Sequence, residues 1–285
     1  MRHPARARGS PSTSRRRRRL GQHFLVNVQA ARRIVERFAP KPGSRVIEIG
    51  PGRGALTTLL MESGASVIAV EVDPGLADEL RERFAGLPPF TLIEADILRC
   101  DIAALAGGEP SRVLANLPYS ITGPVLMRLF AACGSLTDMT LMLQREVANR
   151  IVASPGGRVY GSLSVVAQYF TDPRAIMDLA PGSFSPPPAV SSTVLEMPCR
   201  ARRELTAGDE KLYPAFVRLL FGRRRRTLLN NLKGAGHFPA AILERLPGLA
   251  DPAAGLGRAG LDPLRRPETL ARGECLELFR ALASG

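Results

Sequence analysis

Short apolar runs alternate with segments of helical periodicity between residue 28 and about residue 170. Runs of this length rich in branched residues predict buried strands, and five of them lie at Arg45–Ile49, Ser66–Glu71, Phe90–Ile93, Arg112–Ala115 and Met139–Leu143. Helices are predicted at Val28–Phe38, Ala55–Ser63, Pro74–Phe84 and Pro124–Ala132. Because strands and helices alternate, we expect an α/β fold with a doubly wound, mainly parallel sheet.

The last third of the chain has a different pattern. Two runs, Ala175–Leu179 and Thr193–Met197, predict strands at one edge of the sheet, and the polar stretch Cys199–Asp209 predicts a domain boundary. Beyond it, Leu212–Leu232 and Pro267–Leu282 are predicted helices. We therefore expect three parts: a tail over residues 1–19, an α/β domain over 20–200 and a small all-helical domain over 205–285.

Composition excludes several classes of protein. The chain has 285 residues, of which 45% are hydrophobic and 23% charged, as in globular proteins. No apolar run approaches the roughly 18 residues of a membrane span. The cysteines are widely scattered, at Cys100, Cys133, Cys199 and Cys275. Their spacing predicts neither a disulfide framework nor a metal site. We expect a cytoplasmic protein with reduced thiols, and a monomer.

Positive charge is concentrated at the N-terminus. The formal net charge is +13, and residues 1–19 hold eight arginines and no acid. We expect this tail to be disordered, and no apolar stretch follows it that would make it a secretory signal. Subtracting its eight charges leaves +5 for the remainder, which favours a nucleic-acid partner over a basic surface that serves solubility alone.

A glycine-rich turn follows the first strand, in the sequence Val46-Ile-Glu-Ile-Gly-Pro-Gly-Arg-Gly54. Glycine permits a tight turn and a close approach of the backbone to a ligand at the carboxyl end of a sheet. Gly50, Gly52 and Gly54 are spaced differently from the G-x-G-x-x-G fingerprint of dinucleotide-binding proteins. The turn alone therefore indicates a nucleotide-like ligand without specifying which.

Three acids narrow the choice of ligand. Glu71 ends the second strand, where a carboxylate can accept hydrogen bonds from both hydroxyls of a ribose, and Asp96 follows the third strand, where it can receive an adenine amine. NAD and S-adenosylmethionine share this adenosine half. Glu48, just before the turn, favours S-adenosylmethionine because it can face a positively charged amino-acid group and would repel a pyrophosphate. The alternative for Glu71 and Asp96 is ordinary helix capping or a solvated strand end.

The fourth strand is followed by Asn116-Leu117-Pro118-Tyr119. The Asn116 side-chain oxygen and a backbone carbonyl, of Leu117 or Pro118, can accept the two N–H bonds of an adenine N6 amine and aim its lone pair at a methyl donor. Tyr119 offers a ring for the extruded base, and Phe184, in a proline-rich loop, offers a second. The alternative is a strand-to-loop turn with a packed tyrosine.

Six segments in this order resemble the ribosomal RNA adenine dimethyltransferases: Leu20–Leu25, Glu48–Gly52, Asn116–Tyr119, Leu143–Ala148, Tyr160–Val165 and Phe184–Val190. The resemblance is greatest to the KsgA-type branch, which dimethylates two adjacent adenines in a loop near the 3′ end of 16S rRNA. It implies a seven-stranded class I S-adenosylmethionine methyltransferase fold with a helical C-terminal domain.

The resemblance also implies roles for single residues. These roles are assigned from the positions that match the family's motifs. His23 and Leu25 would close over the cofactor. The cofactor would also be bound by Gly50, Glu71, Asp96 and Asn116, and the target adenine would lie between Tyr119 and Phe184. Without the resemblance, His23 is interpreted as a surface histidine. The arginine-rich tail is unusual for the family.

A second basic segment lies within residues 216–233. Its cations are Arg218, Arg223, Arg224, Arg225, Arg226 and Lys233. A charge run is usually a solvated face, but beside a base-modifying site we expect these residues to dock duplex RNA through its phosphates. The remaining alternatives are a 23S rRNA or DNA adenine methyltransferase, and an assembly factor that binds 16S rRNA particles with little activity.

Overall fold

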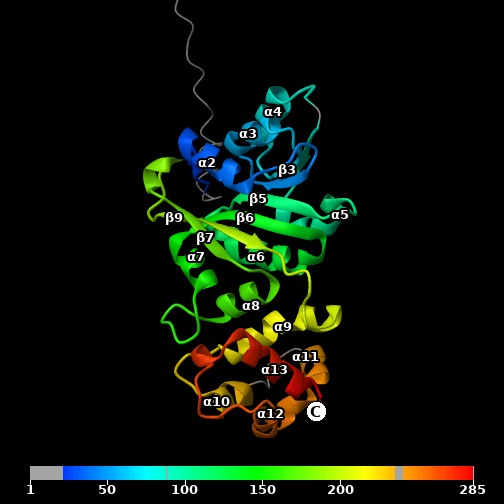
Figure 1. Ribbon diagram of the computed structural model, residues 1–285, viewed down its shortest axis with the longest axis vertical. Coiled ribbons are helices and arrows are strands. Elements are labelled where there is room, and N and C mark those ends of the chain that lie inside the picture. The colour runs from blue at the N-terminus through cyan, green and yellow to red at the C-terminus, as the bar shows by residue number, and fades with distance from the viewer. Residues whose placement is uncertain (1–21, 88, 235–239, 285) are drawn as a thin grey trace, which may run out of the picture.

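The computed structural model describes residues 22–87, 89–234 and 240–284, so the predicted tail over 1–19 lies outside the described residues. Seven strands form one sheet in the order β4-β3-β2-β5-β6-β9-β7 (Figure 1). Within this sheet β9 runs antiparallel to both of its neighbours. The strands are β2 (Arg45–Ile49), β3 (Ser66–Glu71), β4 (Phe90–Glu94), β5 (Ser111–Asn116), β6 (Leu136–Gln144), β7 (Arg174–Leu179) and β9 (Ser192–Pro198). The expected doubly wound sheet is confirmed.

Helices cover both faces of the sheet because its central strands are apolar on both sides. Val46 packs into a cluster with α2 (Val28–Phe38) and α3 (Ala55–Glu62). Ile47, the next residue, points to the opposite face and packs into a second cluster. The helices of that second face are α5 (Ile102–Ala106), α6 (Thr122–Ala131), α7 (Arg145–Val152) and α8 (Ser162–Phe170), while α4 (Pro74–Arg83) contacts β3 and β4.

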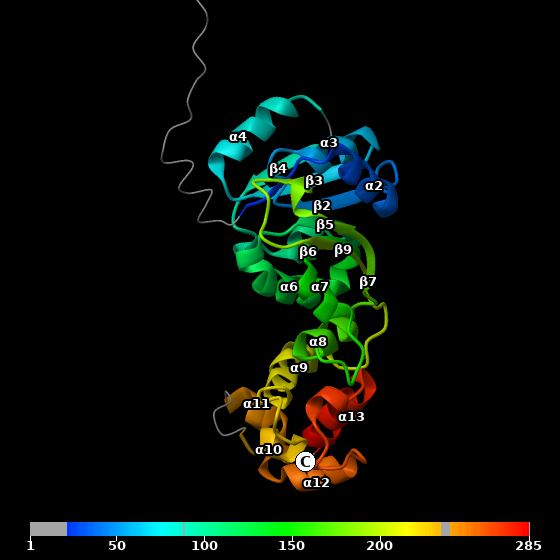
Figure 2. The same cartoon turned by 90° about the vertical axis from the view of Figure 1, so that its left-hand side faces the viewer.

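The C-terminal helices lie at the opposite end of the molecule from α3 and α4, and α8 leads from the sheet toward them (Figure 2). The second apolar cluster continues without a break from Val166 in α8 to Tyr213 and Phe279 in these helices. They are α9 (Ala207–Leu220), α10 (Leu228–Leu232), α11 (Ala240–Arg245), α12 (Pro252–Arg258) and α13 (Arg272–Ala283). None of the helices in the described ranges has the length and apolar character to cross a membrane.

Two predicted helices in this region were wrong in extent. Leu212–Leu232 is not continuous: α9 ends at Leu220, and Thr227 caps the separate helix α10 by accepting from Asn230 N. Asn231 bonds to the backbone of the intervening turn and so stabilises the break. The segment Pro267–Leu282 begins with a single 3₁₀ turn, Pro267–Thr269, before α13.

A small second sheet joins two segments that are distant in the sequence. The strand β1 (Phe24–Leu25) pairs antiparallel with β8 (Phe184–Ser185). The carbonyl of Ser183 also accepts hydrogen bonds from Val26 N and Asn27 N, at 2.9 and 3.2 Å. This pairing holds residues 22–27, called the N-terminal strap below, across the carboxyl ends of the central strands.

Candidate active site

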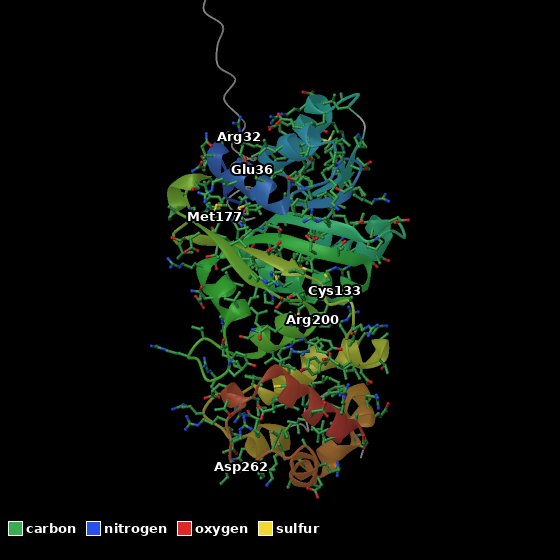
Figure 3. All side chains as sticks on the ribbon, viewed as in Figure 1. Arg32, Glu36, Cys133, Met177, Arg200 and Asp262 are labelled. Atoms are coloured by element: carbon green, nitrogen blue, oxygen red, sulfur yellow. The ribbon has the colours of Figure 1, made fainter. Side chains whose placement is uncertain are left out.

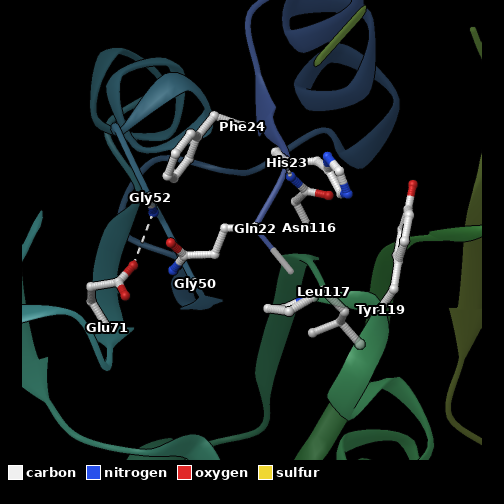
Figure 4. A pocket seen from close by; sticks show the side chains of 10 residues that line it. Gln22, His23, Phe24, Gly50, Gly52, Glu71, Asn116, Leu117 and Tyr119 are labelled. Atoms are coloured by element: carbon white, nitrogen blue, oxygen red, sulfur yellow. Dashed lines mark hydrogen bonds between the residues drawn. The ribbon is translucent and has the colours of Figure 1, made fainter. Parts of the chain in front are cut away.

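A cavity opens where β2, β3 and β5 end and the N-terminal strap crosses them (Figure 4). Its position, at the carboxyl ends of the strands, is the usual one for ligand sites in open α/β sheets. It is lined by Gln22, His23, Phe24, Gly50, Gly52, Glu71, Asn116, Leu117, Pro118 and Tyr119. The structure therefore brings together most of the residues that the sequence predicts for the site.

The glycine-rich turn forms one wall of the cavity. Gly50 and Gly52 have φ values of 65° and 57°, in the left-handed region that favours glycine. A Cβ atom on Gly52 would also lie only 2.9 Å from the ring carbon Cδ1 of Phe24. Glycine is thus required here both by backbone conformation and by the strap packed against it.

Glu71 lies opposite this turn at the end of β3. Its carboxylate accepts hydrogen bonds from the backbone of Gly52 at 3.2 Å and from Val72 and Asp73 at 2.9 Å each. Burial raises the pKa of Glu71, and these three donors oppose the rise. The side chain lines the cavity, so an acceptor oxygen stands where the sequence places the ribose contact.

Glu48 is buried beneath the turn and does not line the cavity. Burial raises the pKa of its carboxyl to about 8; the nearby Glu71 reinforces this rise and Thr57 opposes it. Among the described residues its Oε2 atom has no hydrogen-bond partner. The predicted direct contact with a cationic ligand is therefore not seen, although a buried acceptor without a partner remains close to the turn.

Asp96 is half-buried and lies outside the lining of the cavity. Its Oδ1 atom accepts from Leu98 N at 2.9 Å and so caps the short 3₁₀ helix Ile97–Arg99. This is the capping arrangement that the sequence left open as the alternative. A role in binding adenine stays a prediction.

Asn116 is the last residue of β5, and its side-chain orientation is fixed by the strap. Its Nδ2 donates to the backbone carbonyl of His23 at 2.9 Å. Because the amide nitrogen is engaged there, the Oδ1 atom is left as the acceptor within the cavity.

The two carbonyls that follow Asn116 are not equivalent. The Pro118 carbonyl already accepts from Ile121 N at 3.2 Å and from the Thr122 hydroxyl at 3.1 Å. These two donors can occupy both of its lone pairs. Of the two candidates that the sequence offered as second acceptor, the geometry therefore favours Leu117, whose side chain is buried.

Tyr119 stands at the mouth of the cavity, half-buried, beside His23. The centroids of the two rings lie 5.3 Å apart, with 39° between their planes. The His23 Nδ1 atom bonds to the Pro186 carbonyl at 2.8 Å, which requires that nitrogen to carry its proton. The ring that stands beside Tyr119 in this structure is therefore that of His23.

Two predicted residues lie elsewhere. Phe184 is only 3% exposed and packs in the apolar cluster beneath α2, where it is not available to a base. Leu25 is buried in the same cluster, because β1 pairs with β8 at these two residues. The structure thus brings neither side chain to the cavity, and their contacts with adenine and cofactor stay predictions.

Sequence reasoning missed Gln22 and Phe24, which line the cavity on either side of His23. The Oε1 atom of Gln22 is buried and has no partner among the described residues, as expected of a group that a ligand would satisfy. The guanidinium of Arg53 lies 5.1 Å from the centre of the Phe24 ring. In the sequence, the position of Gln22 and Phe24 next to His23 is the only feature that points to them. No local sequence pattern predicts that the strap folds over Gly52.

The sequence model of the family described as "Ribosomal RNA adenine dimethylase" matches residues 13–248. The chain belongs to this family. It is 42% identical over 265 residues to ribosomal RNA small subunit methyltransferase A of Acidobacterium capsulatum, covering 93% of this chain and 90% of the relative. The enzyme of the same name from Geobacter sulfurreducens is 41% identical over 271 residues, covering 94% and 95%.

Solved structures agree with the fold. A dimethyladenosine transferase from Plasmodium falciparum superposes with a TM-score of 0.74 at 24% identity, covering 90% of this chain and 96% of that one. The 23S rRNA methyltransferase ErmE superposes with a TM-score of 0.66 at 25% identity, covering 91% and 99%. This adenine dimethylase family member therefore has the class I methyltransferase fold, whose methyl donor is S-adenosylmethionine.

The predicted RNA-binding cations of this dimethylase lie on the C-terminal helices. Arg218 is exposed on α9, and Lys233 follows α10. The four arginines between the helices, 223–226, are all exposed and form what we call the arginine turn. The buried side chain of Asn231 donates to the carbonyls of Arg223, Arg226 and Thr227, which fixes this turn.

No group of three or more potential metal ligands occurs among the described residues of this family member. The main features of the site are thus a glycine-rich turn, an acid at the end of β3 and an asparagine at the end of β5. Groups of these types can bind and orient an organic ligand.

Proposed function

We propose that the chain transfers methyl groups from S-adenosylmethionine to N6 of two adjacent adenines in the 3′-terminal loop of 16S rRNA. The observation that carries this proposal is the orientation of Asn116, whose amide nitrogen is engaged by the His23 carbonyl at 2.9 Å. An acceptor oxygen is thereby fixed at the end of β5, in the same cavity that Tyr119 lines. Identity near 40% to small-subunit methyltransferases supports the choice of substrate.

The residues present fit the cofactor. Glu71 offers a carboxylate to the ribose hydroxyls, Gly50 and Gly52 allow the backbone to approach the ligand, and Gln22 has a buried oxygen without a partner. When bound, S-adenosylmethionine supplies an electrophilic methyl group on a positively charged sulfur. Glu48 lies in β2 just before the turn, but because burial raises its pKa to about 8 the carboxyl is mostly protonated at neutral pH and offers the ligand no full negative charge.

Asn116 and Leu117 prepare the nucleophile. An adenine amine is a weak nucleophile because its lone pair is delocalised into the ring. Hydrogen bonds from its two N–H groups to Asn116 Oδ1 and the Leu117 carbonyl would draw the nitrogen toward tetrahedral geometry and free the lone pair. The proton leaves after transfer, since the methylated ammonium is acidic, so positioning and local electrostatics supply the catalysis.

Tyr119 holds the base. Stacking of a base on an aromatic ring contributes roughly 1–3 kcal/mol, which is comparable to the few kcal/mol needed to unstack a base. Flipping is therefore feasible, above all from a loop. The half-buried ring of Tyr119 at the cavity mouth meets this requirement.

The RNA would also bind to a surface of the protein away from the cavity. The arginine turn lies on the C-terminal helices, at some distance from the strands that form the site (Figure 1). We infer that duplex RNA of the small subunit or its precursor docks there through phosphates while the target loop enters the cavity.

The deciding experiment is transfer of radiolabelled methyl from S-adenosylmethionine to unmethylated small-subunit particles, with large subunits as the parallel substrate. We expect dimethyladenine in the 16S loop and none with Asn116→Ala. Label confined to 23S rRNA would place the chain functionally with enzymes such as ErmE. Tight particle binding without label would make it a binding factor and contradict the proposal.

A further inference from the structure

The hydroxyl of Tyr119 has a specific partner that sequence reasoning did not identify. It lies 2.8 Å from the Oγ atom of Ser192. Ser192 is 73 positions further along the chain and is the first residue of β9. The catalytic turn and the edge of the sheet are therefore joined at the ring that would hold the target base.

Ser192 is a rigid anchor. It pairs with Gln144 of β6 on one side and with Leu179 of β7 on the other, and it is 1% exposed. Its backbone is thus fixed between two strands, and its short side chain has few ways to place the hydroxyl.

Tyr119, by contrast, lies in a 3₁₀ turn of three residues, Tyr119–Ile121. Such a short turn restrains a long side chain only weakly. The ring is held instead by contacts at two points: the Ser192 hydroxyl at its tip and the ring of His23 beside it. His23 is in turn bonded to the Pro186 carbonyl, so both contacts depend on the segment 184–192.

We propose that Ser192 is a positioning residue of the methyl-transfer site, which acts through the hydroxyl of Tyr119 and sets the plane on which the target base stacks. The inference rests on the proposed function, because it presupposes that Tyr119 receives an adenine. Stacking requires parallel rings in contact, and a ring fixed in advance does not lose rotamer freedom when the base arrives.

The neighbouring residue provides a matched control. Thr193 is buried like Ser192, lies on the same strand and donates its hydroxyl to Asp178 Oδ1 at 2.6 Å, on the edge strand and away from the cavity. Thr193→Val removes a buried hydroxyl from β9 with nearly the same side-chain shape. Ser192→Ala removes only the oxygen that faces Tyr119.

The experiment is a double-mutant cycle on methyl transfer to small-subunit particles, with Ser192→Ala, Tyr119→Phe and the two combined. We expect each single variant to lower kcat/KM for RNA by roughly three- to tenfold, the usual worth of one hydrogen bond. The double variant should lose no more than either single one, because both changes remove the same hydrogen bond. In Ser192→Ala the Kd for S-adenosylmethionine should stay unchanged, and the Tm should fall no more than in Thr193→Val, which also loses one hydrogen bond.

Three results would overturn this role of Ser192: full activity in Ser192→Ala, multiplicative losses in the double variant, or an equal loss in Thr193→Val. The last would indicate a general effect on the strand. A wild-type chain that transfers no methyl to rRNA would overturn the proposed function and this inference with it. If the wild type transfers methyl groups and Ser192→Ala does so equally well, only the inference about Ser192 is overturned and the proposed function stands.

Discussion

The side-chain amide of Asn116 donates to the backbone carbonyl of His23, across 93 positions of sequence. The bond joins the end of β5 to the N-terminal strap, so the strap does more than cover the cavity: it decides which end of the Asn116 amide faces inward. An asparagine without this partner could turn its nitrogen toward the substrate, where a donor would oppose an amine. The orientation of the Asn116 side chain therefore depends on the pairing of β1 with β8.

Asn116→Asp is the substitution that tests this relationship. It keeps the side-chain shape and an acceptor oxygen but replaces the donor to His23 by a second oxygen, which the carbonyl repels. We expect the single-turnover rate of methyl transfer to fall by about 100-fold or more, as when one preorganised group of an active site is removed. The measurement is transfer of labelled methyl to small-subunit particles at saturating cofactor.

Asn27→Asp is the matched control for that variant. Asn27 belongs to the same strap and caps α2 by accepting from Ala30 N, a role that aspartate fills equally well. It should transfer methyl at close to the wild-type rate. An Asn116→Asp enzyme within threefold of wild type would show that the hydrogen bond from the Asn116 amide to the His23 carbonyl does not set the geometry of methyl transfer.

The buried carboxyl of Glu48 predicts a pH-dependent stability. Burial raises its pKa from 4.5 to about 8 in the folded chain, so the folded state holds a proton that the unfolded state releases above about pH 4.5. This contribution to stability is complete below pH 4.5 and is lost as the pH rises through 8, up to a limit of roughly 5 kcal/mol. Glu48→Gln cannot ionise and should escape this loss.

The measurement is the free energy of unfolding of cofactor-free wild type and Glu48→Gln between pH 4.5 and pH 8. The advantage of the variant should grow with pH. Glu71, whose pKa is also raised, is present in both proteins, so only its electrostatic coupling to Glu48 enters the difference. Glu36→Gln, on the exposed side of α2, is the control and should leave the curve unchanged. Parallel curves for Glu48→Gln and wild type would show that Glu48 is ionised in the folded state.

The burial of Phe184 poses a separate question. The family role predicts that its ring stacks on the target adenine, whereas here it is 3% exposed in the cluster under α2. Phe184→Leu should fold, because a similar apolar volume is retained at a cost below about 1.5 kcal/mol. If the ring leaves the cluster to meet the base, kcat/KM for RNA should fall roughly tenfold because the stacking is weakened.

Phe38→Leu controls for packing in the same cluster, since Phe38 is equally buried and lies on α2 away from the cavity. We expect it to leave kcat/KM unchanged. Equal activities of the two variants would make Phe184 a packing residue only.

Local patterns explain which parts of the fold could be predicted. The strands Arg45–Ile49 and Ser66–Glu71 are observed at the predicted bounds, as is the helix Val28–Phe38. Their apolar runs are continuous and end at glycine or at a capping residue, so local signals and tertiary structure agree. The positions of Gly50, Gly52, Glu71 and Asn116 around the cavity follow from the same strand ends.

What could not be predicted depends on contacts between distant segments. The pairing of Phe24 with Ser185 has no periodic signal, because each strand has only two residues. Without it, neither the place of Gln22 and Phe24 in the cavity nor the burial of Phe184 can be anticipated. The break between α9 and α10 is similar: Asn231 stabilises it by bonds that a helical pattern of leucines does not reveal.

The arginine turn leads to the last prediction. Its four side chains are exposed, and the Asn231 amide fixes its backbone, so the charges are presented in a set arrangement. Arg224 also donates to the Arg158 carbonyl at 2.6 Å, which joins the turn to the loop before α8. Reversal of charge at Arg224 and Arg225 should weaken binding to small-subunit particles and lower the salt slope of log K by about one for each phosphate that the variant no longer neutralises.

The control is the same change of charge at the other end of the molecule. Arg32 and Arg33 are exposed on α2, and Figure 3 shows Arg32 near the end opposite Asp262 of the C-terminal part. Arg32→Glu with Arg33→Glu alters the net charge equally and should change affinity only through the long-range field, with an unchanged slope. If both double variants reduced the slope alike, net charge alone would account for binding. An intact slope in the Arg224 and Arg225 variant would show that the RNA docks on another surface.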